Sequence, residues 1–243
     1  MKGNVRIAVA GWSVPKDCAS RFPAAGSHLG RYAQVMRAVE INSSFYRAHR
    51  RRTYERWAAA APPDFSFAVK IPREISHRRR LVDAREPLLR FLDETAGLGE
   101  KRGPLLLQLP PSLPFRDAQA AAFFETARAL YDGDMVCEPR HPSWFAPLVE
   151  ATLQTFRVAR VGADPPPAPG ADDPAGWRGL VYLRLHGSPK TYYSAYGEER
   201  LRALAVVLTR AAAVPTWCVF DNTAEGEAIR DALRLASLLG EAP

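Results

Sequence analysis

The sequence predicts a single (β/α)8 barrel of the TIM type, formed by residues 1–243. Eight short apolar runs alternate with longer stretches of helical spacing along these 243 residues, which is typical of parallel βαβ units. The chain length suits one barrel of about 250 residues, and an apolar fraction of 47% is sufficient for a large core. Polar residues follow the apolar runs about every 30 residues, the usual length of a βα unit.

The expected strands lack alternation of apolar and polar residues, as parallel strands covered on both faces do. They span residues 5–10, 35–41, 65–71, 104–109, 135–137, 156–161, 180–185 and 216–220. Helical spacing of apolar residues predicts helices at 53–61, 86–97, 117–130, 146–153, 198–213 and 224–239. Thr53 and Asp117 are the expected N-caps of two of them. Residues 162–170 contain four prolines and predict an irregular loop after the sixth strand, in place of a helix.

Composition excludes several classes of protein. No run approaches the roughly 20 apolar residues that span a bilayer, and the first residues lack the long apolar stretch of a secretory signal. We therefore expect a cytoplasmic protein without a membrane partner. Cys18, Cys137 and Cys218 are odd in number and show no CxxC spacing, which argues against a disulfide framework or a zinc site.

The net charge of +7 favours anionic partners, such as nucleic acid, phosphorylated metabolites or anionic lipid. Arginine-rich coding gives the same excess without any function. Two arginine runs, 50–52 and 78–80, follow the second and third strands. They either steer an anionic ligand or form solvated surface.

Polar side chains stand at the carboxyl ends of nearly all expected strands, the end of a barrel that is called its mouth. They are Trp12, Glu40, Asn42, Lys70, Gln108, Glu138, Arg140, Asp164, Arg184, His186 and Asp221. Residues two apart in a strand share a face, so Glu40 and Asn42 share the face of Ala38, while Val39 and Ile41 point the other way. The polar set is thus expected to face the interior. Catalytic groups of such barrels come from these strand ends, although the same charges could simply neutralise one another as structural ion pairs.

Aromatic residues and one asparagine also follow strand ends. Tyr46, Trp144 and Tyr196 could stack on a sugar or a base, or pack the loops. Asn222 precedes the last expected helix and would cap it. A phosphate can bind at such a helix N-terminus, but Glu225 in the first turn would repel it.

Several motifs in the same order resemble the YecE-like family, also called domain of unknown function 72. The motifs lie at 11–13, 40–46, 53, 57, 67–70, 108–112, 138–144, 182–187, 196 and 220–223. The resemblance covers almost the whole chain. It implies a TIM-type barrel with a loose relation to sugar isomerases, but not a reaction. The chain departs from the family pattern at Val14, where the family usually has tyrosine, and before Phe22, where a further tryptophan and glycine are missing.

The first functional hypothesis is an enzyme acting on a small anionic or polyol substrate, such as a phosphorylated sugar, by isomerisation or hydrolysis. Arg140 and Arg184 would clamp the anion, because guanidinium forks match phosphate or carboxylate oxygens. Lys70, crowded by these cations, would have a lowered pKa and act as base or Schiff-base nucleophile. The full catalytic set is Lys70, Glu138, His186, Glu40 and Asp221, with acid–base roles for the carboxylates and the imidazole.

Substrate contacts are expected from the remaining polar and aromatic residues. They are Trp12, Asn42, Tyr46, Gln108, Arg140, Trp144, Asp164, Arg184, Tyr196 and Asn222. No cofactor is predicted, but a divalent metal on Glu40, Glu138, His186 and Asp221 stays open. The cations of the mouth and the absence of HxH or HExxH spacing argue against it.

Two other classes of function remain as alternatives. Nucleic-acid binding or processing fits the basic charge, the arginine runs and the loop aromatics, and predicts binding that weakens steeply with salt. A non-catalytic binding barrel predicts that replacing Lys70 or Glu138 leaves physiology intact. The sequence does not fix the oligomeric state.

Overall fold

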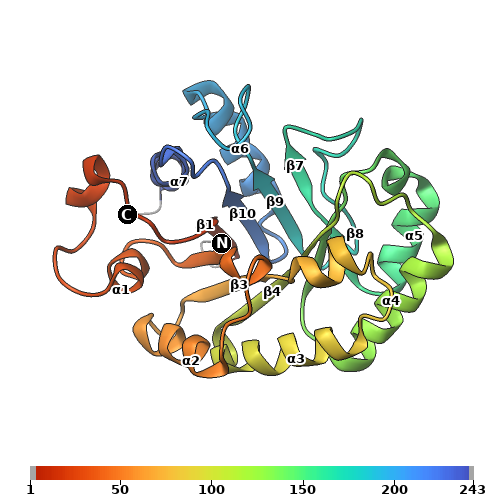
Figure 1. Ribbon diagram of the computed structural model, residues 1–243. Helices are drawn as coiled ribbons and strands as arrows, with labels where there is room; N and C mark the ends of the chain where they lie inside the picture. The colour runs from red at the N-terminus through yellow and green to blue at the C-terminus, as the bar shows by residue number, and fades with distance from the viewer. Residues whose placement is uncertain (1–3, 241–243) are drawn as a thin grey trace.

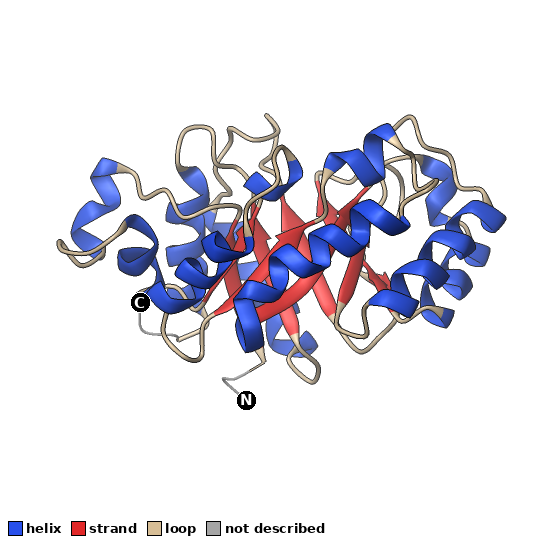
Figure 2. Cartoon of the chain, turned by 60° about the horizontal axis from the view of Figure 1, so that its bottom comes forward, coloured by secondary structure: helices blue, strands red, loops and turns tan. Residues whose placement is uncertain are grey.

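The computed structural model describes residues 4–240, with the strands at the centre and helices around them (Figures 1 and 2). The strands form two hydrogen-bonded sheets. One sheet has the order β1 (Val5–Val9), β10 (Thr216–Phe220), β9 (Val181–Leu185) and β7 (Gly162–Asp164). The other has the order β2 (Ala38–Ile41), β3 (Ser66–Lys70), β4 (Arg102–Gln108), β5 (Met135–Glu138), β6 (Val158–Arg160) and β8 (Ala175–Gly176). Between residues 4 and 240, all paired strands run parallel except β6 and β8.

The helices fall largely where their apolar spacing predicts them. They are α1 (His28–Ala33), α2 (Arg51–Ala60), α3 (Arg85–Thr95), α4 (Asp117–Leu130), α5 (Pro147–Thr155), α6 (Glu198–Ala211) and α7 (Glu227–Leu238). Short helical turns precede or follow several of them, at Lys16–Arg21, Ser43–Phe45, Glu74–Arg78, Ala96–Lys101 and Pro142–Phe145. Helix α1 has no counterpart among the expected helices, and Ser27 caps it by accepting a hydrogen bond from the Gly30 amide at 3.0 Å.

Three expected caps are wrong. The cap positions of α2 and α4 are held by Arg50 and Arg116, so Thr53 and Asp117 lie inside the first turns. The last helix begins at Glu227 rather than Ala224, because residues 223–226 form a separate turn closed by a hydrogen bond from the Gly226 amide to the Thr223 carbonyl. Asn222 is consequently not the cap of α7.

The chain itself passes from one sheet to the other between β6 and β7. β6 pairs with β5, whereas β7, which follows after Val161, pairs with β9. Residues 162–164, expected as loop, are therefore strand, and the irregular proline-rich segment begins at Pro165. At the opposite margin of the sheets, a single parallel bridge joins Ala10 after β1 to Glu40 in β2. The parallel α/β architecture is confirmed, and its closure into one eight-stranded barrel stays a prediction.

Alternate residues of the strands separate two apolar clusters, as expected. Val39 and Ile41 belong to the large outer cluster that the helices cover. A smaller interior cluster lies on the other face of the strands and contains Ala8, Ala38, Ala68, Leu106, Val136, Ala159, Tyr182, Trp217 and Val219. It is tightly filled: a Cβ on Gly103 would lie 2.9 Å from the Trp217 ring. The interior cluster forms a floor beneath the polar residues at the strand ends.

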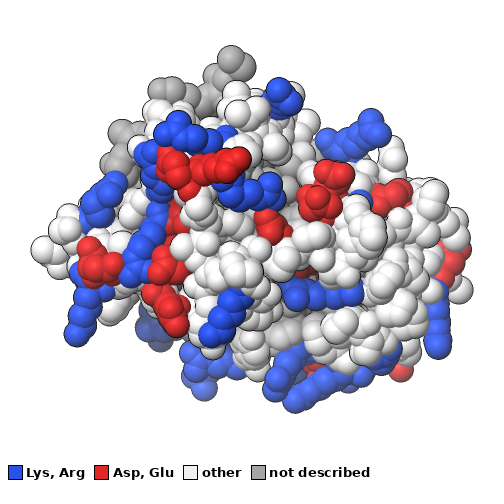
Figure 3. Space-filling view, turned by 90° about the horizontal axis from the view of Figure 1, so that it is seen from above, with Lys and Arg blue, Asp and Glu red and all other residues white. Residues whose placement is uncertain are grey.

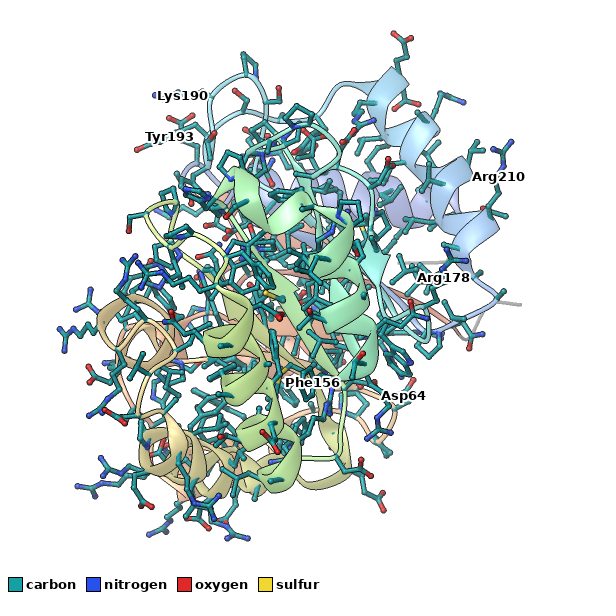
Figure 4. All side chains as sticks on the ribbon, turned by 90° about the vertical axis from the view of Figure 1, so that its right-hand side faces the viewer. Asp64, Phe156, Arg178, Lys190, Tyr193 and Arg210 are labelled. Atoms are coloured by element: carbon teal, nitrogen blue, oxygen red, sulfur yellow. The ribbon has the colours of Figure 1, made fainter. Side chains whose placement is uncertain are left out.

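The two ends of the strands are distinguished in Figure 4. Lys190 and Tyr193, on the loop after β9, lie at one end of the molecule, and Arg178 before β9 and Arg210 in the last turn of α6 lie toward the other. The functional residues expected from the sequence belong to the end with Lys190. Within residues 4–240, no helix is both long and apolar enough to cross a membrane. All three cysteines are buried free thiols, as their spacing predicts.

Candidate functional site

Arg184 in β9 lies at the centre of a buried group of charges above the interior cluster. Its side chain is 0% exposed. Nε and Nη2 donate to the two carboxylate oxygens of Glu40 at 3.1 and 2.7 Å, and Nη1 donates to Glu138 Oε2 at 2.7 Å. Nη2 also donates to Asp221 Oδ2 at 2.9 Å. Burial alone would lower the pKa of Arg184, but the three carboxylates raise it well above its ordinary value. Arg184 is therefore the shared counter-ion of three carboxylates, and protein atoms occupy the donors that would otherwise clamp a substrate.

His186 connects two of these carboxylates. Its Nδ1 lies 3.0 Å from Asp221 Oδ2, and its Nε2 lies 2.8 Å from Glu138 Oε1. Both ring nitrogens thus face carboxylate oxygens, and Nε2 also lies 3.1 Å from Arg140 Nη2. Arg140, whose side chain is 24% exposed, donates to the same Glu138 oxygen at 2.9 Å.

The two acids are held in their charged forms by these neighbours. Burial would raise the pKa of Glu138, but Arg184, His186 and Arg140 together lower it well below its ordinary value. Burial likewise opposes ionisation of Asp221, and Arg184 and His186 again lower the pKa below the ordinary value. Both residues are thus expected to be carboxylates at neutral pH.

Lys70, at the end of β3, is the cation of this group that lacks a carboxylate partner. It is 4% exposed, and its Nζ lies 4.2 Å from the centre of the Phe45 ring. Among residues 4–240, no carboxylate oxygen lies within 4.0 Å of Nζ. The pKa of Lys70 is lowered to about 8, mainly by burial and then by the charge of Arg184, while the three carboxylates oppose the shift. A substantial fraction of neutral amine is therefore present just above neutral pH.

Two further side chains complete the hydrogen bonds of the glutamates. Gln108 Nε2 donates to Glu138 Oε2 at 2.9 Å, and the Tyr182 hydroxyl donates to Glu40 Oε2 at 2.8 Å. Asp221 differs, because both of its contacts use Oδ2. In the described part of the chain, Asp221 Oδ1 has no hydrogen-bond partner, which leaves a carboxylate oxygen available beside Lys70. We call Glu40, Lys70, Glu138, Arg140, Arg184, His186 and Asp221 the charged cluster.

Three residues expected at the site instead hold loops and helices together. The Asp164 carboxylate accepts from Arg200 Nε and Nη2 at 3.0 and 2.6 Å, so it faces α6 rather than the charged cluster. Trp144 is buried and donates from Nε1 to the Leu113 carbonyl at 2.9 Å. The Tyr196 hydroxyl donates to the Asp164 carbonyl and accepts from the Gly187 amide.

Four other expected contacts lie around the charged cluster rather than in it. The Trp12 ring packs edge-on against Trp57 at 5.0 Å. Tyr46 is 63% exposed. Asn42 Oδ1 is buried and, within residues 4–240, has no hydrogen-bond partner. Asn222 donates to Asp231 Oδ2 at 2.7 Å and so joins the last strand to α7.

His77 is a candidate that sequence reasoning missed. It lies on the helical turn after β3, with its ring 5.0 Å from the Phe45 ring and Nδ1 2.9 Å from Ser76 Oγ. Burial lowers the pKa of His77, and Lys70 and Arg140 lower it further. A neutral imidazole therefore stands beside the charged cluster. Its position in the sequence could have indicated it, because His77 lies on the loop after the carboxyl end of a parallel strand, where functional residues are found in this class of fold.

Tyr192 is another aromatic residue that follows a strand end and lies close to the charged cluster. Its ring meets the His186 ring edge-on at 5.8 Å, and its backbone has a φ of 72°. The left-handed region is costly for a tyrosine, and such strain is concentrated at functional sites. A hydrogen bond from the Tyr192 amide to the His186 carbonyl, at 2.5 Å, holds this conformation.

A divalent metal does not fit the charged cluster as it is arranged here. Three of the four candidate ligands, Glu40, Glu138 and Asp221, direct oxygens at the Arg184 guanidinium, which takes the place a cation would occupy. The fourth, His186, presents its nitrogens to two of the same carboxylates. In the described residues, no three His, Cys, Asp or Glu side chains converge as a metal-binding group.

The surface charges are mixed rather than uniformly basic on the face seen from above. Acidic and basic side chains are interspersed there (Figure 3). Ion pairs that involve α6 and α7 accord with this pattern, among them Arg234 with Glu198 and Arg230 with Asp17.

Comparison with known proteins matches residues 6–243 to a family described as "Protein of unknown function DUF72". UPF0759 protein YecE of Escherichia coli K12 is 28% identical over 143 residues, which are 58% of this chain and 50% of that protein. The chain thus spans about half the length of the curated relatives it matches.

Two solved structures share the fold along nearly the whole chain. A DUF72 family protein from Enterococcus faecalis V583 aligns with a TM-score of 0.81 at 20% identity, over 98% of this chain and 96% of that one. A DUF72 family protein from Thermotoga maritima MSB8 aligns with a TM-score of 0.77 at 26% identity, over 98% and 99%. With the family match over residues 6–243, these likenesses establish that the chain belongs to the DUF72 family.

Proposed function

We propose that this protein is an enzyme that acts on a small anionic or polyol substrate carrying a carbonyl group, such as a sugar phosphate. The reaction takes place at the carboxyl ends of the strands, in a (β/α)8 barrel closed by the Ala10–Glu40 bridge and by the passage from β6 to β7. Those two connections are the support for closure, because they join both margins of the sheets. A relation to sugar isomerases agrees with the reaction type proposed below.

The observation that carries the proposal is the difference between Lys70 and the other cations of the charged cluster. Arg184 and Arg140 are paired with carboxylates, whereas Lys70 has none within 4.0 Å among the described residues and has a pKa near 8. Keeping a buried lysine without a counter-ion is costly, because desolvation disfavours its charged form. A purely structural cluster gains nothing from it, but an amine nucleophile needs this lowered pKa.

The proposed chemistry begins with the neutral amine of Lys70. Nζ forms a bond to the substrate carbonyl carbon and passes one of its two protons to the carbonyl oxygen. This oxygen takes a second proton from solvent and leaves as water, while the nitrogen keeps its other proton. The resulting iminium draws electrons from the adjacent C–H bond, whose proton passes to a base. Asp221 Oδ1 and the His77 ring are the nearby groups without a full set of partners that can take and return this proton.

Arg140 is the residue of the charged cluster best suited to donate a hydrogen bond to a substrate oxygen. It is partly exposed, and its Nε is buried without a hydrogen-bond partner in residues 4–240. An unmade hydrogen bond of a buried charged donor is costly, so a ligand oxygen that accepts it gains affinity. Arg184, by contrast, positions the carboxylates.

Reductive trapping tests the proposal. The protein is incubated at pH 8 with ribose 5-phosphate and related aldehyde or ketone sugar phosphates, then reduced with borohydride and mapped by mass spectrometry. We expect a stable adduct at Lys70 with at least one substrate, lost in Lys70→Met and kept in the control Lys190→Met, whose side chain is exposed. Equal labelling of exposed lysines in both variants, or no Lys70 adduct with any carbonyl substrate, contradicts the proposal.

A further inference from the structure

A hollow lies beside Phe45, the residue whose ring contacts Lys70. It has a volume of about 180 Å³ and opens between the loops that follow β2 and β3. One wall is loop 44–48, a second is formed by residues 72–74 and 78, and a third is a face of α3. Phe45 is the shared partition, because it lines the hollow and also lies 4.2 Å from Lys70 Nζ.

The hollow gathers arginines that have no acidic partners. Among residues 4–240, Arg47, Arg73 and Arg90 have no carboxylate oxygen within 4.0 Å, whereas Arg78 is paired with Glu74 at 3.3 Å. In total, four arginines and two glutamates line the hollow, which leaves a charge of +2. Burial is the main cause that raises the pKa of the second glutamate, Glu94, and the charge of Arg90 opposes this shift. Like charges held together repel unless an anion neutralises them.

Aromatic side chains continue from this hollow to the charged cluster. Tyr46 is exposed, with the Arg73 guanidinium 6.0 Å from its ring centre, and it meets Phe45 edge-on at 5.0 Å. On the inner side, His77 packs against Phe45 at 5.0 Å, and its ring is close enough to Arg73 and Lys70 to respond to both charges. Phe45 is therefore the side chain that the hollow and Lys70 share as a neighbour.

We propose that this hollow is the phosphoryl-binding subsite of the enzyme, in which Arg47, Arg73 and Arg90 bind the phosphate of a sugar phosphate whose carbonyl end reaches Lys70. The role of Lys70 rests on the function proposed above, whereas the phosphate site rests on the arginines alone. Guanidinium groups suit this role because their donors match phosphate oxygens in pairs. The free phosphate ion supplies the same chemistry and binds the same arginines more weakly, because it lacks the contacts of the sugar.

Calorimetric binding of inorganic phosphate, ribose 5-phosphate and ribose tests the inference. The variant Arg73→Gln with Arg90→Gln is compared with Arg178→Gln combined with Arg210→Gln. Arg178 and Arg210 lie toward the other end of the molecule (Figure 4), and their replacement removes the same charge. Like Arg73 and Arg90, they are exposed and, within residues 4–240, have no carboxylate oxygen within 4.0 Å. We expect the Kd for ribose 5-phosphate to rise about tenfold or more in the first variant and to stay within about twofold in the control.

Each further outcome separates the subsite from the Lys70 chemistry. In Lys70→Met the Kd for ribose 5-phosphate should stay within about threefold, while the borohydride adduct disappears. A tenfold loss in the arginine variant without any Lys70 adduct supports the subsite and rejects the proposed reaction. Equal affinity in both arginine variants overturns the subsite, whatever Lys70 does. A thymidine oligonucleotide that binds more tightly than ribose 5-phosphate, with a steep salt dependence lost in the arginine variant, overturns it in favour of nucleic acid.

Discussion

Replacing Arg184 with methionine should destabilise the protein strongly, and in a manner that depends on pH. The variant keeps the length of the side chain but removes the counter-ion of Glu40, Glu138 and Asp221, all of which are buried. Removing one partner of a buried ion pair lowers the free energy of unfolding by about 3–5 kcal/mol. The total free energy of unfolding of a domain is about 5–15 kcal/mol. At neutral pH the midpoint of thermal unfolding should therefore fall by about 10 °C.

The pH dependence follows from the direction of the pKa shifts. In the wild type, Glu138 and Asp221 have lowered pKa values, so the stability they contribute is present above their ordinary values near 4 and is lost as pH falls further. Without Arg184, burial dominates and should raise these pKa values. The folded variant then binds more protons than the unfolded chain between about pH 4 and 7, so its stability rises as pH falls through that range.

Urea unfolding at pH 5 and at pH 7.5 measures this difference. The stability gap between wild type and Arg184→Met should be smaller at pH 5, and Arg210→Met, an exposed control on α6, should show almost no gap at either pH. If the variant is too unstable to study, adding Glu40→Gln should restore part of the stability, since one uncompensated charge disappears. A gap below about 1 kcal/mol, or one equal at both pH values, would refute a central role of Arg184 as counter-ion.

Three other substitutions have clear expected outcomes. Lys70→Met should stabilise the protein at pH 7 by up to about 3 kcal/mol in urea unfolding, because the pKa of Lys70 is lowered to about 8. For the same reason, the wild type should gain stability as pH rises from about 8 to 10.5. A loss of stability on substitution would show that the amine is structural. Asp231→Asn should stabilise the fold by about 2 kcal/mol at pH 7 and leave its stability nearly unchanged at pH 4, because burial raises the pKa of Asp231 to about 6. The amide oxygen of the asparagine can still accept hydrogen bonds from both Asn222 and Tyr196. Equal effects on stability at both pH values would contradict this prediction. Trp144→Phe should cost about 1–3 kcal/mol through the lost hydrogen bond and volume, without changing ligand affinity, which calorimetry would check.

The parallel α/β arrangement could be predicted because buried strands and amphipathic helices differ in period. The strand Thr216–Phe220 begins and ends where its apolar run does. The passage from β6 to β7 was not predictable in this way, since Gly162 and the prolines after it are typical of a loop. What holds β7 is its pairing with β9, a tertiary contact that leaves no local signal.

The charged cluster could be predicted in composition but not in internal arrangement. Strand alternation placed Glu40, Glu138 and Arg184 on the inner face, and the structure brings them together. The strand pattern does not reveal which acid pairs with which base. Arg184 was therefore expected to bind substrate, although its donors form hydrogen bonds with three carboxylates. Asp164 ends a strand as Lys70 and Glu138 do, yet its carboxylate accepts hydrogen bonds from Arg200 on α6 and so faces away from the charged cluster.

The position of β1 in its sheet has a consequence for biosynthesis. Its hydrogen-bonded partner along its whole length is β10, and Val5 lies opposite Thr216. Until β10 leaves the ribosome, β1 can make only the single bridge to β2. Its apolar residues stay exposed meanwhile, a state in which chains aggregate or recruit chaperones. Truncations that remove β10 should therefore leave an aggregation-prone first strand, even though they retain most of the charged cluster.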